Sequence, residues 1–185
     1  MQAALRYVGV LNAAVWLGAT VFFTFGAGPA IFSDEAAAFL PRAYRARMAE
    51  LVIARLIVLQ QVCGLVALGL FLAESIRAGR LVRRLALGVV SALFLSSLLA
   101  GFWLAPKMHS LQQVRYSARS TPEQQATAAR SFNLLHGLSQ TVNLFVLAGL
   151  LFHLAQVTRT PDTPANRWNA FRSQAPTDGT VPRML

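Results

Sequence analysis

The chain has 185 residues, of which 55% are hydrophobic and 13% are charged, and its formal net charge is +10. Soluble domains carry about 25% charged residues, so this composition leaves too little polar surface to cover a soluble globule. The single cysteine, Cys63, excludes a disulfide framework and a cysteine-based metal cluster. The basic residues lie at the ends of apolar stretches rather than in one stripe, which argues against nucleic acid as a partner.

Four uncharged stretches predict membrane-spanning helices, because a helix needs about 20 mostly apolar residues to cross the hydrocarbon layer. We place the spans at about 7–28, 51–73, 85–106 and 131–156. Within lipid, a helix pairs its backbone polar groups internally. The prediction is an all-α, integral membrane four-helix bundle with short loops over residues 1–158, followed by a flexible, proline-rich cytoplasmic tail over residues 159–185.

The first span is too long for the apolar core of a cleaved signal peptide, which runs for about 7–15 residues. After it, Ser33 followed by Asp34 and Glu35 indicates the start of a short helix. Pro41 is expected to break or kink the segment that leads into the second span. This outer connection is therefore predicted to be helical.

The second span contains Arg55, Gln60 and Gln61, and a strongly basic connection follows it. That connection carries four arginines against the single acid Glu74: Arg77, Arg80, Arg83 and Arg84. Short loops rich in arginine stay on the cytoplasmic side of a membrane. We therefore predict both termini in the cytoplasm and assign the chain to the bacterial inner (plasma) membrane, with its arginines touching anionic lipid headgroups.

The third span carries small residues at every fourth position: Gly88, Ala92, Ser96 and Ala100. Such a row lets two helix backbones approach closely in a membrane. It predicts a packing face whose partner is either a neighbouring span or a second copy of the chain. A homo-oligomer through the third span is one outcome of this pattern.

The fourth span is predicted to begin outside the membrane at Ser120-Thr121-Pro122-Glu123, which offers a cap, a proline at the first helical position and a capping-box glutamate. Further along, polar residues follow a 3-4-3 spacing: Asn133, His136, Gln140 and Asn143. At 100° per residue these four side chains fall within about 80° of arc. They form one polar stripe on an apolar helix.

Two interpretations of these polar residues stay open. In the first, Arg55, Gln60 and the stripe on the fourth span line a small polar cavity open to the outer face, with Arg55 and His136 lining it together, because burying a charge in a span is costly. In the second, the amides and imidazole only bond the helices to one another. The corresponding functions are binding or passing a small polar solute or ion, or a structural or assembly role.

No catalytic constellation, cofactor site or metal site is predicted. A haem with two histidine ligands is disfavoured because His136 and His153 lie 17 residues apart on one helix, about 25 Å. No ligand spacing supports a metal site among the outer residues His109, Asp34, Glu35 and Glu50. His109 and His153 lie near span ends, where interfacial positions are expected. We therefore expect the protein not to be an enzyme.

Two segments resemble a known family. Trp16-Leu17-Gly18, Phe22-Phe23 and Ala27-Gly28-Pro29 in the first span, with His136-Gly137 and Asn143-Leu144 in the fourth, are similar to domain of unknown function family 4149. The animal relative of that family is called transmembrane protein 205. The resemblance covers about residues 5–155 and implies a four-span membrane protein without an established activity and without catalytic residues to carry over.

Overall fold

A computed structural model describes residues 2–78 and 84–159. Within these residues the chain forms only helices, and four of the helical segments are long and apolar enough to cross a membrane. In chain order the elements are α1 (Gln2–Phe22), η1 (Phe23–Ala27), α2 (Gly28–Ile31), α3 (Asp34–Phe39), α4 (Arg42–Ala78), α5 (Arg84–Leu99), η2 (Ala100–Leu104), α6 (Ala105–Tyr116) and α7 (Pro122–Thr158). The predicted all-α membrane bundle is confirmed. The predicted tail, with a short helix expected near 164–172, lies outside the described residues.

Local sequence explains where the helices of the outer connections begin. The Ser33 hydroxyl caps α3 by accepting a hydrogen bond of 3.2 Å from the Ala36 amide. The break predicted at Pro41 is confirmed, because α3 ends at Phe39 and α4 begins at Arg42.

The predicted glutamate of the second cap is wrong. Thr121 is the N-cap of α7 and Pro122 occupies the first turn, so the third helical position is Gln124 rather than Glu123. The Thr121 hydroxyl accepts from the Gln124 amide, and the Gln124 side chain accepts from the Thr121 amide. Proline, which lacks an N–H, moves the cap one residue later than a box starting at Ser120 would require.

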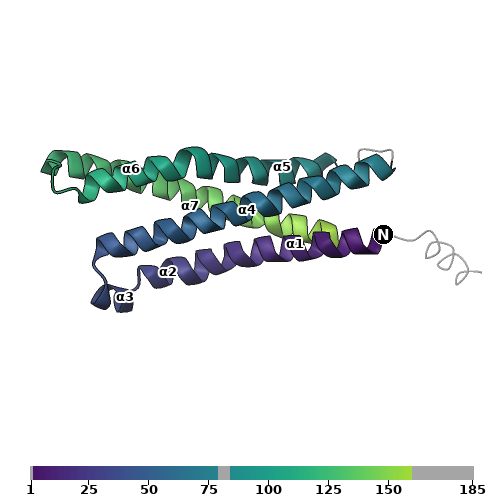
Figure 1. The fold of residues 1–185 in the computed structure, drawn as a ribbon, viewed down its shortest axis with the longest axis horizontal. Helices are drawn as coiled ribbons and strands as arrows, with labels where there is room; N and C mark the ends of the chain where they lie inside the picture. The colour runs from purple at the N-terminus through teal and green to yellow at the C-terminus, as the bar shows by residue number, and fades with distance from the viewer. Residues whose placement is uncertain (1, 79–83, 160–185) are drawn as a thin grey trace, which may run out of the picture.

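The four membrane-spanning segments form a ring in which each packs on two neighbours (Figure 1). The order around the ring is α1, α4, the continuous rod of α5, η2 and α6, and then α7. Arg6 donates a 3.0 Å hydrogen bond to the Thr158 carbonyl, so the two described ends of the chain meet at one end of the bundle. We call the opposite end, which holds α3 and the turn between α6 and α7, the outer end, after the predicted orientation (Figure 1).

The core lies in the inner half and takes residues from all four segments: Trp16, Cys63, Ala67, Val90, Leu93 and Leu150. Gly64 lets Trp16 approach, because a Cβ there would lie 2.7 Å from Phe94 and 3.2 Å from the Trp16 ring. Large apolar side chains on the outside of the bundle are exposed, among them Phe22, Phe25, Leu65, Leu134 and Phe145. Apolar surface of this extent is typical of contact with the lipid bilayer.

The small-residue row of the third span turns gradually around the helix. Gly88 and Ala92 are exposed, whereas Ser96 and Ala100 are half-buried. A spacing of four residues drifts by about 40° per step at 100° per residue, which accounts for the change of face. The packed face of α5 consists of Ala86, Val90, Leu93 and Ser97. A contact between the exposed part of the row and a second copy stays a prediction.

Candidate functional site

A column of side chains that carry polar groups runs along the inward face of α1 and into η1. Its members recur at every fourth position: Asn12, Trp16, Thr20 and Thr24. Trp16 and Thr20 are fully buried, and Asn12 donates a 3.0 Å hydrogen bond to the Cys63 carbonyl of α4. Sequence reasoning missed this column, although its four-residue spacing was visible.

The outer part of this column joins the first span to α4 and α7 through a chain of hydrogen bonds. Asn143 of α7 donates to the Thr24 hydroxyl at 2.8 Å, and Thr24 donates to the Thr20 carbonyl at 2.7 Å. The Thr20 hydroxyl donates to the Trp16 carbonyl at 2.9 Å and accepts from Gln60 of α4 at 3.4 Å. Both threonine hydroxyls therefore have a donor and an acceptor as partners.

A second amide joins α4 to α5 on the other side of the bundle. Gln61 donates a 3.4 Å hydrogen bond to the Ser97 carbonyl, and Ser97 is buried. Gly101 gives this amide its room, because a Cβ there would lie 2.9 Å from the Gln61 nitrogen and 3.0 Å from Ile57. Close backbone approach and an amide bond thus coincide here, as is common between membrane helices.

Below this network, His153 is buried against aromatic rings. The predicted interfacial position of His153 is wrong, since its ring is 3% exposed and lies 6.5 Å from Trp16 and 6.2 Å from Phe71 between centroids. Trp16 Nε1 and His153 Nδ1 are buried without a hydrogen-bond partner among the described residues. The inner half of the bundle is therefore a packed core, and the outer half holds the accessible polar groups.

The polar stripe of α7 is exposed beyond the junction with Thr24. Asn133, His136 and Gln140 are exposed, and Asn143 is half-buried. His136 precedes Asn143 by seven residues, so it lies two turns nearer the outer end, about 20° from Asn143 around the helix. His136 stacks on Phe132 at 5.9 Å, and its Nε2 lies 3.4 Å from the Gln140 amide nitrogen. The face that packs on α1 below therefore continues as an open polar face above.

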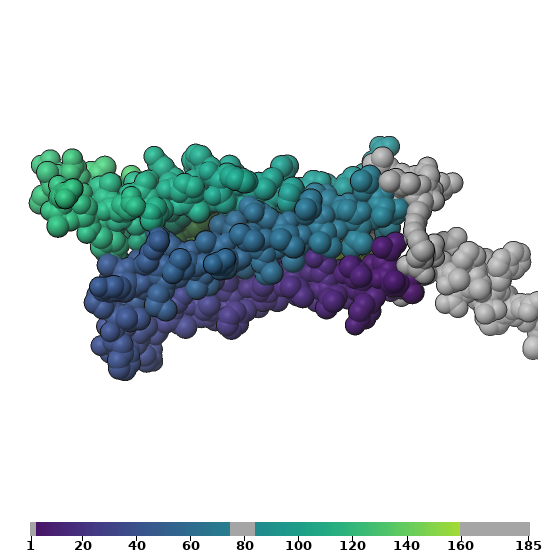
Figure 2. Space-filling model, in the orientation of Figure 1, coloured from purple at the N-terminus to yellow at the C-terminus, as the bar shows by residue number. Residues whose placement is uncertain are grey.

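The molecule is split at this end. Figure 2 shows the green α6–α7 hairpin standing apart from the blue and purple α2–α4 segment, with an opening between them that narrows toward the middle of the bundle. We call this opening the outer wedge. The Asn143–Thr24 hydrogen bond joins α7 to η1, and Asn133, His136 and Gln140 lie on α7 between that bond and the outer end.

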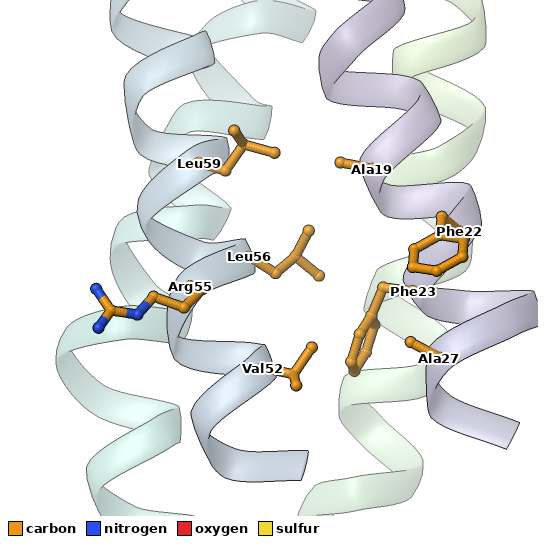
Figure 3. Close-up of a pocket in the computed structure, with 8 residues that line it drawn as sticks. All are labelled: Ala19, Phe22, Phe23, Ala27, Val52, Arg55, Leu56 and Leu59. Atoms are coloured by element: carbon orange, nitrogen blue, oxygen red, sulfur yellow. The ribbon is translucent and has the colours of Figure 1, made fainter. Parts of the chain in front are cut away.

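Arg55 does not join the predicted cavity. It borders an apolar groove of about 300 Å³ between α1 and α4, together with Phe23, Val52 and Leu56. In Figure 3 the aliphatic side chains point into this groove, whereas the Arg55 guanidinium points away from it. His136 does not line this groove. Of the six predicted residues, Asn133, His136 and Gln140 share the open face, Gln60 and Asn143 belong to the half-buried network with Thr20 and Thr24, and Arg55 is separate.

One polar cluster ties the two sides together near the outer end. Glu50 of α4 accepts from Arg47 at 2.8 Å and lies 3.1 Å from Nδ1 of His109 on α6. Gln113 lies 2.9 Å from the other ring nitrogen of His109. Within residues 2–78 and 84–159, no three histidine, cysteine or acidic side chains gather as a metal site would require. The cluster is a link between α4 and α6.

The Asn143–Thr24 hydrogen bond should be measurable as a coupling free energy. In a double-mutant cycle with Asn143→Leu and Thr24→Val, we expect a coupling of about 1 kcal/mol, because interhelical hydrogen bonds in membranes contribute about 0.6 kcal/mol on average and about 1.7 at most. The measurement is unfolding in mixed micelles with increasing denaturing detergent. Ser96→Ala should be additive with Asn143→Leu, since the Ser96 hydroxyl donates to the Leu93 carbonyl of its own helix. A coupling near zero for Asn143 and Thr24 would contradict the prediction.

Comparison with known proteins adds one finding. A family model described as domain of unknown function (DUF4149) matches residues 11–117, more than half of the chain. The match contains the first-span residues that carry the predicted resemblance and ends before His136 and Asn143. No curated protein and no solved structure shows significant similarity to the chain. The narrower likeness to transmembrane protein 205 stays a prediction.

Proposed function

The chain belongs to the DUF4149 family, a domain of unknown function, and we propose that it is a non-enzymatic membrane protein that binds or passes a small polar solute or ion through the outer wedge. One observation carries this proposal. The face of α7 that packs on α1 at Asn143 and Leu150 becomes polar and exposed at His136 and Gln140. Polar side chains at membrane depth need water or protein beside them, and the wedge offers room for water.

The chemistry of the stripe points to the kind of solute. Imidazole and amide groups both donate and accept hydrogen bonds, so Asn133, His136 and Gln140 suit a neutral molecule that carries hydroxyl or amide groups. The Arg115 guanidinium lies 6.0 Å from the Phe132 ring, on which His136 stacks, and places a positive charge near the mouth. This charge also favours an anion over a cation.

The placement in the membrane follows the arginine distribution. We propose the bacterial inner membrane, with both termini cytoplasmic and the wedge opening outward, and with residues 1–158 as the membrane domain. Arginines at the ends of the spans would contact anionic headgroups. A homo-oligomer would use the exposed Gly88 and Ala92 of α5.

Water in the wedge can be tested with single cysteines in a Cys63→Ala background. His136→Cys should react with a membrane-impermeant thiol reagent added from outside at least about tenfold faster than Leu134→Cys, because a residue in lipid is shielded from water. Leu134 is the matched control: it lies two residues away at nearly the same depth, about 160° from the His136 direction, and is 76% exposed. The measurement is the labelling rate in intact proteoliposomes.

Two outcomes would overturn the proposal. If neither cysteine reacts, the wedge holds no water in the membrane. If both react equally, this part of α7 stands outside the bilayer and the stripe is an ordinary wet surface. A third measurement identifies the side: labelling of His136→Cys only from the side that carries the tail would reverse the proposed orientation.

A structural role is the second candidate, and a specific observation favours it. Thr20, Thr24, Gln60 and Asn143 bond to one another, so these four residues need no ligand. In this alternative the amides lock the bundle, and another protein covers the stripe of α7. Unreactive His136→Cys in the membrane, becoming reactive only after the purified protein is separated from its partners, would favour this alternative.

A further inference from the structure

The two halves of the chain repeat the same order of elements. In the first half, α1 leads into the π-helical η1 and then a small residue and a proline, Gly28-Pro29. In the second half, α5 leads into η2 and then Ala105-Pro106. Each half ends with a helix of 37 residues next to a proline: α4 follows Pro41, and α7 begins at Pro122.

The two π segments are built alike. The Gly28 amide donates to the Phe23 carbonyl, and the Ala105 amide donates to the Ala100 carbonyl, so each bond spans five residues instead of four. The next residue in each case is a proline, which has no amide hydrogen to continue the helical pattern. A π turn holds one residue more than an α turn and is a frequent feature of functional sites.

The halves are also arranged symmetrically in space. In Figure 1, α4 passes in front from the lower left to the upper right, and α7 passes behind from the upper left to the lower right. The α1–α2 rod lies below them and the α5–α6 rod above. A half-turn about the long axis of the bundle therefore exchanges the two halves, as in membrane proteins built from parallel repeats.

Amide side chains cross between the halves in both directions close to the two π segments. Asn143 of the second half bonds Thr24 of the first, and Gln61 of the first half bonds Ser97 of the second beside Gly101. Thr20 and Ser97 are 97 − 20 = 77 residues apart, Thr24 and Gly101 are 101 − 24 = 77 apart, and η1 and η2 begin 100 − 23 = 77 apart. Each long helix thus brings an amide to the opposite half within about one helical turn of the start of its π segment.

We propose that η1 and η2 are paired hinges about which the outer ends of the two halves rock, opening and closing the outer wedge. At and just beneath the hinges the amide contacts hold the halves together, and further down the core around Trp16 does so. Above them the α6–α7 hairpin stands apart, and the Glu50–His109 contact links α4 to α6. The inference rests on the proposed function, because the wedge is the entrance that the hinges control.

Distances between spin labels test the hinges. In a Cys63→Ala background, labels at Ala37 on α3 and Ala126 on α7 report the separation of the two outer ends, and both positions are exposed. Labels at Ala4 and Ala155, also exposed, report the inner end. In lipid nanodiscs we expect a broad distribution of distances for the outer pair and a narrow one for the inner pair.

Removing the extra residue of each π turn should abolish the motion. Deletion of Phe25 and Phe102, which are 67% and 78% exposed, restores α-helical pairing without removing a buried side chain. The distance distribution of the outer labels should then become as narrow as that of the inner labels. Phe25→Ala with Phe102→Ala keeps the residue count and is the matched control, which should stay as broad as the wild type.

A second variant keeps the test decisive if the deletions do not fold. Asn143→Leu removes the hydrogen bond to Thr24 and should shift the distance between the outer labels to larger values, while the distance between the inner labels stays unchanged. A narrow outer distribution in the wild type that neither the deletions nor Asn143→Leu alter would overturn the hinges. If the outer distances do not vary but His136→Cys reacts with the thiol reagent, the wedge is rigid and filled with water, and only the hinge proposal is wrong. If the outer distances vary but His136→Cys does not react, the proposed solute site is wrong and the hinges remain.

Discussion

Gly64→Leu is expected to destabilise the protein by about 3 kcal/mol and to lower its midpoint of thermal unfolding in detergent by about 10 °C. Gly64 faces the core cluster around Trp16. Even a Cβ atom would lie 2.7 Å from Phe94 Cδ2 and 3.2 Å from both Phe94 Cβ and Trp16 Cη2. A leucine adds three more carbon atoms, so the α4 and α5 backbones must separate.

The control for this prediction lies on the same helix. Gly69 has no atom within 4 Å of an added Cβ and is exposed, so Gly69→Leu should shift the midpoint by little. Thermal unfolding followed by intrinsic fluorescence compares the two variants with the wild type. Equal losses for Gly64→Leu and Gly69→Leu would show that helix propensity, and not the packing seen around Trp16, sets the effect.

Trp16→Ala is expected to cost still more, about 3–5 kcal/mol, because it leaves a large void in a packed interior. Trp16 is 1% exposed, is among the largest fully buried side chains, and lies in the cluster that draws on all four membrane-spanning segments. Trp103, which is 51% exposed, provides the matched substitution. Trp103→Ala should leave the midpoint nearly unchanged.

The two large losses should partly cancel in one protein. The Trp16 ring is one of the two side chains that a Gly64 side chain would strike, so Gly64→Leu in a Trp16→Ala background fills space that the indole has left. The double variant should therefore be more stable than the sum of the two losses predicts. Strict additivity would mean that the residues do not share this space.

The predictions for Gly64 and Trp16 concern the packed core that closes the inner end of the wedge. Trp16 follows Asn12 and precedes Thr20 in the polar column of α1, and the buried core around it separates the wedge from the inner end. A loose inner half would turn the wedge into one end of a passage, whereas the packed half favours binding at the outer side. The stability of the core therefore tests whether the inner half of the bundle is closed, and the accessibility of His136 tests whether the outer half is open to water.

Composition and local patterns determined the membrane class, the four spans, the break at Pro41 and the cap at Ser33. Each depends on short stretches of chain: apolar length decides whether a helix can cross lipid, and caps depend on residues three or four positions apart. The first-span residues from Trp16 to Pro29 also indicated the family whose model matches the chain. The stripe of Asn133, His136, Gln140 and Asn143 was visible as well, because helical periodicity places its members on one face.

Only the tertiary structure decided which way those faces turn. Lipid is as apolar as the interior of the bundle, so hydrophobicity cannot indicate the rotation of a span as it does for a helix in water. Hydrophobicity therefore did not indicate that the Arg55 guanidinium would point away from the groove between α1 and α4, that Gly88 and Ala92 would be exposed, or that His153 would be buried. The amide contacts of Asn143 with Thr24 and of Gln61 with Ser97 join residues far apart in the chain, which meet only when the two halves pack together.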